Sequence, residues 1–262
     1  SMKQRSDQVR AKKFLGQHFL NDEQVAKDIV AALTLPDDTN TVLEIGPGMG
    51  VLTKYLLEEK NYTTWAVELD RESVPYLLAR YTDLNGRLIE GDFLQLDLEK
   101  LFPGKFAIIG NFPYNISSQI LFRILDMKER VPVMVGMFQK EVAERIASPP
   151  GNRDYGILSV LLQPWYEIDY LFTVHEHQFD PPPRVKSAVL SMRRNNRTEL
   201  GCDEAFFKRL IKQGFSQRRK TLRNALKPLL PKDASHIPYL DLRAEALGWE
   251  QFVELSKLLN HR

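Results

Sequence analysis

Four consecutive residues, Asn111-Phe112-Pro113-Tyr114, carry the side chains best suited to chemistry in this sequence. They follow the apolar run 106–110, which indicates a buried strand, and Pro113 prevents the backbone from continuing as a helix. We therefore expect them at the carboxyl end of a strand, where open parallel α/β sheets bind ligands. An Asn carbonyl oxygen accepts a hydrogen bond from an exocyclic amine, and a Tyr ring stacks on a heterocycle. The pattern favours a site for a planar amine, and its alternative is a simple turn.

A glycine-rich loop supplies a second feature of a nucleotide-type site. An apolar strand is expected over 41–45, followed by Gly46-Pro47-Gly48-Met49-Gly50 and a helix over 51–59. Glycines allow the backbone to approach a ligand closely. The order strand, loop, helix is typical of nucleotide sites, but these glycines lack the dinucleotide spacing, which disfavours a dehydrogenase.

Two carboxylates follow at successive strand ends. Glu68 lies near the end of a strand expected over 65–70, 22 residues beyond Gly46, and a carboxylate at that distance can accept both ribose hydroxyls. Asp92 follows a strand expected over 87–90, where it can accept from an adenine amino group. The glycine-rich loop, Glu68 and Asp92 thus lie at the ends of three successive expected strands, and together they indicate an adenosine-containing ligand.

The remaining elements predict an α/β domain followed by a helical one. Helices are expected from Asn21-Asp22 to about 33 and over 71–81, 117–126, 139–147 and 157–162, and strands over 131–138, 166–174 and 187–192. Beyond residue 196 the apolar residues recur only at helical spacing, so a second, helical domain is expected to begin there.

Charge is distributed unevenly, although the net charge is only +2. Residues 184–227 contain 13 Lys and Arg against 3 acidic residues, and residues 1–13 contain 5 against 1. A solvated helix face would normally mix both signs. The segregation favours a polyanionic partner that contacts two basic surfaces.

The composition bears on the cellular compartment of the protein and on metal binding. The single cysteine, Cys202, allows no internal disulfide and is typical of a reducing compartment. No apolar run approaches the roughly 20 residues needed to span a bilayer, so a soluble, cytoplasmic protein without a membrane partner is expected. His175 and His177 are expected on one face of a strand, but two histidines without a third ligand make a poor metal site, and no metal is expected.

Ordered motifs spanning nearly the whole chain resemble the small-subunit ribosomal RNA adenine dimethyltransferases of the KsgA type. The matching segments are Gly16-Gln17-His18-Phe19-Leu20, Glu44 to Gly50 with Leu52-Thr53, Glu68-Leu69-Asp70, Gly91-Asp92, Asn111 to Ile116, Gln139 to Val142, Tyr155-Gly156 with Leu158-Ser159-Val160, Phe179 with Pro181-Pro182-Pro183 and Val185, and Phe215 to Lys220. Two positions depart, since the family usually has Asn where His18 stands and Leu where Phe112 stands.

The resemblance implies a Rossmann-like class I methyltransferase with a mostly parallel seven-stranded sheet. It implies a catalytic domain over 1–195 that binds S-adenosylmethionine and releases S-adenosylhomocysteine, and a helical RNA-binding domain over 196–262. Residues implied to bind the cofactor are His18, Leu20, Gly46, Gly48, Glu68, Asp92 and Asn111. Residues implied to hold the target base are Asn111, Phe112, Pro113, Tyr114 and, opposite Tyr114, Phe179.

The resemblance also implies the substrate, two adjacent adenosines near the 3′ end of 16S rRNA in a late small-subunit assembly particle. Residues expected to contact RNA are Arg184, Arg218, Arg219, Lys220 and Arg223, with the amino-terminal lysines, in a protein expected to be monomeric. The related large-subunit methyltransferase of macrolide resistance shares most cofactor motifs and is an alternative. Glutamine or DNA-adenine methyltransferases, or an assembly factor that acts by binding, are further alternatives.

Overall fold

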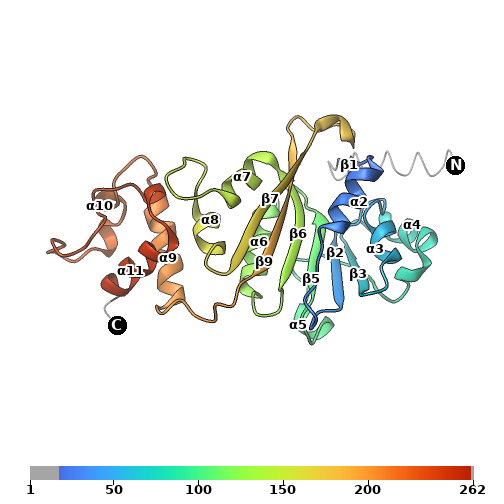
Figure 1. Ribbon diagram of the computed structural model, residues 1–262, viewed down its shortest axis with the longest axis horizontal. Coiled ribbons are helices and arrows are strands. Elements are labelled where there is room, and N and C mark those ends of the chain that lie inside the picture. The colour runs from blue at the N-terminus through green and yellow to red at the C-terminus, as the bar shows by residue number, and fades with distance from the viewer. Residues whose placement is uncertain (1–17, 261–262) are drawn as a thin grey trace. The chain divides into compact units, whose positions relative to one another are not determined.

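The computed structural model describes residues 18–260 (Figure 1). The basic segment 1–17, including Gly16-Gln17 and the amino-terminal lysines, lies outside the described residues. The chain divides into two compact units: one holds the chain up to residue 143 together with 169–194, and the other holds 144–168 together with 195–262.

A seven-stranded sheet forms the centre of the first unit, in the order β4-β3-β2-β5-β6-β9-β7. The strands are β2 (Thr41–Ile45), β3 (Thr63–Glu68), β4 (Leu88–Glu90), β5 (Ala107–Asn111), β6 (Val133–Gln139), β7 (Tyr166–Val174) and β9 (Ser187–Arg194). The five strands from β4 to β6 are parallel, and β9 joins β6 antiparallel. This confirms the Rossmann-like, mostly parallel sheet that the resemblance implied.

Helices cover the sheet on both faces, because alternate residues of its inner strands are buried on opposite sides. The helices of this unit are α2 (Glu23–Ala31), α3 (Thr53–Glu58), α4 (Ser73–Arg80), α5 (Leu98–Leu101), α6 (Ser117–Asp126) and the start of α7 (Lys140–Ala147). Ile29 of α2 and Leu56 of α3 pack with Ile109 and Val135 in one apolar cluster, while Ile108 on the opposite side is equally inaccessible to solvent.

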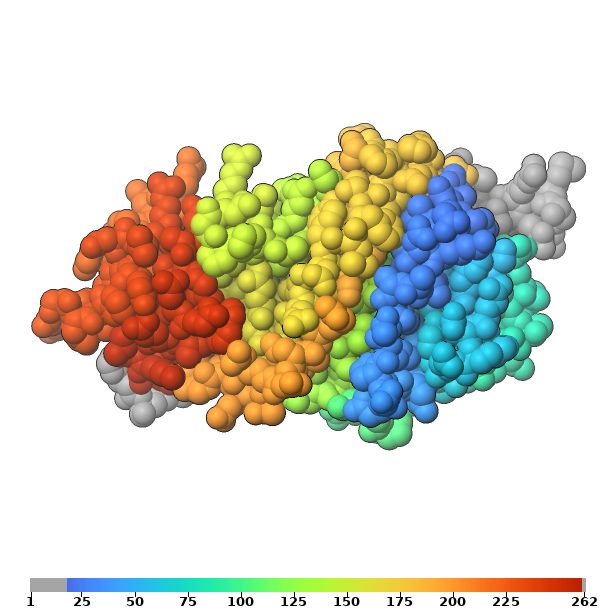
Figure 2. Space-filling view, viewed as in Figure 1, coloured from blue at the N-terminus to red at the C-terminus, as the bar shows by residue number. Residues whose placement is uncertain are grey.

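A short strand pair ties the amino-terminal segment to a distant part of the chain. In β1 (Phe19–Leu20) and β8 (Phe179–Asp180), Phe19 pairs with Asp180 and Leu20 with Phe179, antiparallel. Figure 2 shows the blue amino-terminal segment lying against the yellow segment that leads to β8. The next helix, α2, starts as predicted at Asp22, whose carboxylate accepts from the backbone N–H groups of Gln24 and Val25 at 3.0 and 3.1 Å.

The described part of the second unit after residue 194 contains helices and no strand, as predicted. The α-helices of the whole unit are the rest of α7, then α8 (Ile157–Leu162) and, after residue 194, α9 (Glu204–Phe215), α10 (Leu222–Ala225) and α11 (Trp249–Leu259). The Phe215 ring lies between those of Tyr155 and Phe252, with centroids 6.1 and 6.0 Å away. Since Tyr155 packs on α9, residues 144–168 join this unit, although the sequence assigned them to the first domain.

Most predicted elements are present with both ends within two residues of those expected, but the two histidines are placed differently. His175 follows the end of β7 and His177 lies in a short 3-10 helix, Glu176–Gln178. The prediction that both lie on one strand face is therefore wrong. β7 ends at Val174, and the His175 N–H then donates to the Gln178 side-chain oxygen at 2.7 Å, which closes a turn.

Phe112 occupies a slot that two glycines leave open. Gly110 on β5 and Gly136 on β6 lie opposite each other in register, and Phe112 is 1% exposed. A Cβ on Gly136 would lie 2.3 Å from the Phe112 ring, and one on Gly110 would lie 2.6 Å from the Ile45 carbonyl oxygen. The ring also packs edge-on against Phe138, with centroids 5.2 Å apart. The side chain of Phe112 is therefore part of the core, and only its backbone is available to a ligand.

We predict that Gly136→Ala lowers the free energy of unfolding by about 1–3 kcal/mol, because the added methyl group overpacks this slot. Adding Phe112→Leu to Gly136→Ala replaces the ring by a smaller side chain and should restore part of the lost free energy of unfolding. Urea unfolding measures both, with Gly104→Ala as the control, since a Cβ at Gly104 meets nothing within 4 Å. Equal effects of the two glycine substitutions would contradict this explanation.

Candidate functional site

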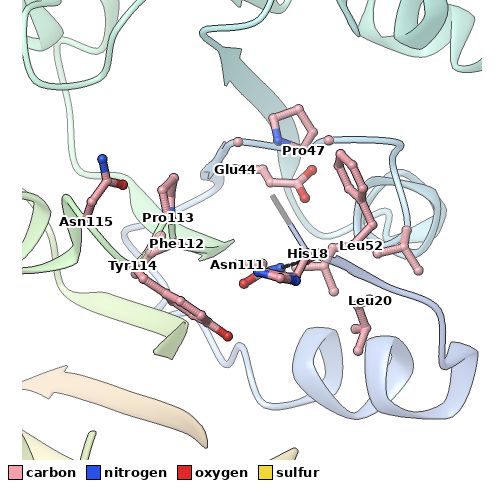
Figure 3. A pocket seen from close by; sticks show the side chains of 14 residues that line it. His18, Leu20, Glu44, Pro47, Leu52, Asn111, Phe112, Pro113, Tyr114 and Asn115 are labelled. Atoms are coloured by element: carbon pink, nitrogen blue, oxygen red, sulfur yellow. Dashed lines mark hydrogen bonds between the residues drawn. The ribbon is translucent and has the colours of Figure 1, made fainter. Parts of the chain in front are cut away.

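A cavity of about 280 Å³ opens where β2 and β5 end. Its walls are residues 18–20, Glu44, residues 46–48, Val51, Leu52 and residues 111–115 (Figure 3). The sequence-predicted residues His18, Leu20, Gly46 and Gly48 and the whole segment 111–114 are therefore brought together. They come from three stretches of chain that the parallel sheet and the β1–β8 pair place side by side.

The glycine-rich loop turns away from β2 through two glycines in the left-handed region. Gly46 has φ 65° and Gly48 has φ 60°, a conformation that a side chain disfavours. A Cβ on Gly48 would lie 2.5 Å from the Phe19 ring. The loop can therefore lie close to β1 and expose its backbone to the cavity only because these residues are glycine.

Glu68 anchors this loop and does not line the cavity. Its two carboxylate oxygens accept hydrogen bonds from the backbone N–H groups of Gly48 and Asp70, both at 3.0 Å. The side chain is buried, and desolvation raises the pKa of Glu68, while the hydrogen bonds from Asp70 and Gly48 lower it. In this structure the role of Glu68 is to hold the end of β3 against the glycine-rich loop.

Glu44 is a cavity residue to which sequence reasoning gave no role. It lies in the interior of β2, is 1% exposed, and accepts a hydrogen bond from the Thr53 hydroxyl. Burial raises the pKa of Glu44 to about 8, the Thr53 bond opposes that shift, and the charge of Glu68 adds to it. The sequence signal for such a role is a carboxylate inside an otherwise apolar strand. A buried charge costs free energy, so its presence there indicates a functional role.

Asn111 is oriented by a backbone group from the amino-terminal segment. Its side-chain Nδ2 donates to the His18 carbonyl oxygen at 3.3 Å, as Figure 3 shows. His18 is itself fixed, because its ring Nδ1 lies 2.7 Å from the Pro181 carbonyl oxygen and must donate to it. With the amide nitrogen engaged, Asn111 Oδ1 is the atom left to accept a hydrogen bond at the cavity.

Tyr114 presents a ring that is held at its hydroxyl end. The phenol oxygen lies 2.7 Å from the Ser187 Oγ, and the ring is nearly parallel to that of His18, with centroids 6.3 Å apart and an angle of 21°. Desolvation raises the pKa of Tyr114, and the Ser187 hydrogen bond partly offsets that shift. The phenol is therefore neutral at physiological pH.

Two further predicted residues lie outside the cavity wall. Asp92 is half-buried beyond β4, and its Oδ1 accepts from the Leu94 N–H at 2.9 Å. Phe179 is 2% exposed and packs in the same apolar cluster as Leu20. Phe179 supports the β1–β8 pair from the core side, so the structure does not place it opposite Tyr114 at the cavity.

The five predicted RNA contacts differ in their surroundings. Arg218 is half-buried, donates to the carbonyl oxygens of Arg153 and Tyr155, and lies 3.6 Å from the Glu245 carboxylate. Arg223 donates from two nitrogens to Asp241. The remaining residues, Arg184, Arg219 and Lys220, are exposed.

Other site types are not found in the described chain. Across residues 18–260 no group of three or more His, Cys, Asp or Glu side chains is arranged to hold a metal ion. Over the same residues, every helix is too short or too polar to cross a bilayer.

The raised pKa of Glu44 predicts that the free energy of unfolding depends on pH. Because the folded pKa of Glu44 lies above its unfolded value, the folded state binds a proton more tightly than the unfolded state does. Raising the pH from about 5 to 8 therefore lowers the free energy of unfolding. The isosteric Glu44→Gln variant should gain stability relative to wild type by up to about 1.4 kcal/mol per pH unit in that range. Urea unfolding of both proteins at pH 5, 6, 7 and 8 measures the difference, and a pH-independent difference would contradict the raised pKa.

Comparison with solved structures supports the same fold. A dimethyladenosine transferase from Plasmodium falciparum aligns with a TM-score of 0.77 at 23% identity, covering 91% of this chain and 96% of that one. The 23S rRNA methyltransferase ErmE aligns with a TM-score of 0.66, also at 23% identity, covering 91% of this chain and 99% of that one. At these identities the similarity establishes the architecture alone.

Sequence comparison identifies the family. The family model described as ribosomal RNA adenine dimethylase matches residues 8–260. A ribosomal RNA small subunit methyltransferase A from Parabacteroides distasonis is 60% identical over 254 residues, which cover 95% of this chain and 93% of that protein. One of the same name from Cytophaga hutchinsonii is 56% identical over 255 residues, 97% of this chain and 99% of that protein. The chain therefore belongs to the ribosomal RNA adenine dimethylase family.

Proposed function

We propose that this protein transfers methyl groups from S-adenosylmethionine to N6 of two adjacent adenosines near the 3′ end of 16S rRNA, in a late small-subunit assembly particle. The observation that carries the proposal is the Asn111 side chain, whose Nδ2 is held by the His18 carbonyl so that Oδ1 is left to accept from an amine. The relatives named as small-subunit methyltransferases support the choice of substrate.

The cavity chemistry suits S-adenosylmethionine, which carries a sulfonium, an ammonium group and an adenosine. A Cβ on Gly46 would meet nothing within 4 Å, so there is room beside the loop backbone at that residue. Glu44 offers a buried carboxylate whose ionisation a bound cation would favour. His18 and Leu20 close the amino-terminal side. When bound, S-adenosylmethionine supplies an electrophilic methyl group.

Glu68 and Asp92 are proposed contacts for the ribose and the adenine of the same ligand. Both already accept backbone hydrogen bonds, which fix the orientation of each carboxylate. Each oxygen has two lone pairs and can accept a further hydrogen bond from a hydroxyl or an amino group. Preformed carboxylates of this kind select a ligand without having to reorganise.

The protein's part in the reaction is to position and polarise a weak nucleophile. The lone pair of an aryl amine is delocalised into its ring, so correct placement is the main requirement. Asn111 Oδ1 and the Phe112 carbonyl oxygen would accept the two N–H bonds, which lets the nitrogen become pyramidal. The same oxygens stabilise the positive charge that develops on it. The Tyr114 ring would stack on the base after the base leaves its helix.

No dedicated general base is needed, because the protonated product amine loses its proton readily to water. The second transfer requires the monomethylated nitrogen to return to the same two acceptors. Phe179 remains a proposed partner of the base opposite Tyr114, although reaching it requires a rearrangement of the β1–β8 region, where Phe179 is buried.

RNA would be held mainly through its phosphates, by exposed cations including Arg184, Arg219 and Lys220. Arg218 and Arg223 already have protein partners, so we assign them first to holding the loop before α8 and the segment at Asp241. A cytoplasmic monomer acting on the assembling particle is the setting we propose.

Methyl transfer to ribosomal particles tests the substrate. Labelled S-adenosylmethionine should yield dimethyladenosine at two neighbouring sites of immature small subunits that lack the modification. Transfer to large-subunit rRNA instead would favour the macrolide-resistance alternative, and binding without transfer to either would favour an assembly factor.

Asn111→Ala should abolish most methyl transfer, by about 10²-fold or more in kcat, because it removes the side-chain acceptor for the amine. Binding to the immature particle, measured by co-sedimentation, should be retained. Asn85→Ala is a matched control, since Asn85 is exposed and does not line the cavity. If Asn111→Ala lost both methyl transfer and binding to the immature particle, the role assigned to Asn111 would be contradicted.

The Arg219→Ala/Lys220→Ala double variant should bind immature subunits more weakly, with a salt dependence shallower by about 1–2 in the log–log slope. A control with the exposed residues changed as Lys60→Ala/Lys100→Ala removes the same charge elsewhere. An unchanged slope in the first variant would show that these two cations do not contact phosphate.

A further inference from the structure

We propose that Ser187 is a positioning residue for methyl transfer, acting through the hydroxyl of Tyr114 to fix the plane in which the target base is held. This rests on the proposed function and adds a residue to it. The geometric basis is the hydrogen bond of 2.7 Å between Ser187 Oγ and the Tyr114 phenol oxygen.

Ser187 is a rigid anchor. It is the first residue of β9, it is fully buried, and it pairs with Gln139 in the antiparallel ladder between β9 and β6. The preceding residue, Lys186, extends this pairing, since its carbonyl oxygen accepts from the Lys140 N–H at 2.9 Å. The Ser187 hydroxyl is therefore held by the central sheet.

Tyr114, by contrast, lies in a connection outside regular structure, between the end of β5 and the start of α6. Its backbone carbonyl accepts from the Ser117 hydroxyl at 3.2 Å, which fixes the main chain but leaves rotation about the side-chain bonds. The hydrogen bond to Ser187 fixes the far end of the side chain. The main chain of Tyr114 is thus held by Ser117 of α6, and the hydroxyl end of its side chain by Ser187 of β9.

The bond is suited to a constant orienting role. A phenol and an alcohol each have a donor and an acceptor, so the pair remains bonded whichever of them donates. Burial raises the pKa of Tyr114, so the phenol stays protonated at physiological pH. The contact is therefore not expected to switch with pH.

Orientation matters because the amine and the ring are placed by separate groups. Asn111 and the Phe112 carbonyl receive the amine, whereas Tyr114 sets the plane of the attached base. Rotation of the ring would tilt the purine about its amine and turn the nitrogen lone pair away from the methyl carbon. Small errors of placement in a reaction that depends on positioning lower kcat rather than substrate affinity.

Ser187→Ala and Tyr114→Phe each remove this hydrogen bond while keeping the ring. In methylation of immature small subunits, each should lower kcat by about tenfold, with KM changed less than about twofold. The double variant should be no slower than either single variant, because both changes break the same contact. Ser187→Thr, which keeps the hydroxyl, should retain most of the rate.

Ser191→Ala is the matched control, because Ser191 is a buried serine of the same strand, four residues further along. Its kcat should remain at the wild-type value. Affinity for S-adenosylhomocysteine, measured by calorimetry, and the melting temperature should match wild type in Ser187→Ala.

Several outcomes would overturn the proposal. These are a wild-type kcat in Ser187→Ala, a double variant in which the two losses multiply, a Ser187→Thr variant as slow as Ser187→Ala, or a loss of rate matched by a loss of folding or of S-adenosylhomocysteine affinity. Failure of the wild-type protein itself to methylate small subunits would instead overturn the proposed function. The two failures are therefore distinguishable.

Discussion

The parallel pairing of β2 with β5 is the constraint on which the site depends. Ile45 lies opposite Gly110, so the glycine-rich loop that follows Ile45 and the Asn111 that follows Gly110 emerge at the same sheet edge. The strands approach so closely that a Cβ at Gly110 would lie 2.6 Å from the Ile45 carbonyl oxygen. The loop backbone is thereby placed next to the Asn111 side chain, which we propose receives the amine. Neither segment could select this arrangement alone.

The β1–β8 pair completes the site from outside the sheet order. By pairing Leu20 with Phe179, it brings His18 to the cavity, where the His18 carbonyl oxygen orients the Asn111 amide. An Asn side chain with a free amide could turn either its nitrogen or its oxygen to the ligand. The long-range pair therefore decides which atom of Asn111 is left to accept a hydrogen bond at the cavity, although the bond itself is only one contact of 3.3 Å.

Burying two carboxylates at this edge has opposite consequences for stability and for binding. Desolvation disfavours the ionised forms of Glu44 and Glu68 and raises both pKa values. The hydrogen bond that Glu68 accepts from the Gly48 N–H partly offsets the desolvation cost of Glu68 and fixes the loop. A cationic ligand would offset more of it, so the same groups that weaken the empty fold favour its occupation. This is a common trade between stability and function at a binding site.

The sequence by itself determined the alternation of strands and helices, the strand-end positions of Glu68, Asp92 and Asn111, and the family, because hydrophobic period, glycine spacing and ordered motifs are local signals. Tertiary structure decided which atoms face the cavity. It placed Phe179 in the core and brought Ser187 to Tyr114, 73 residues away in the chain. It also gave Arg218 backbone partners and grouped residues 144–168 with the helical unit. These outcomes depend on packing between distant segments, and no local pattern of residue types encodes a contact whose partner is set by the whole fold.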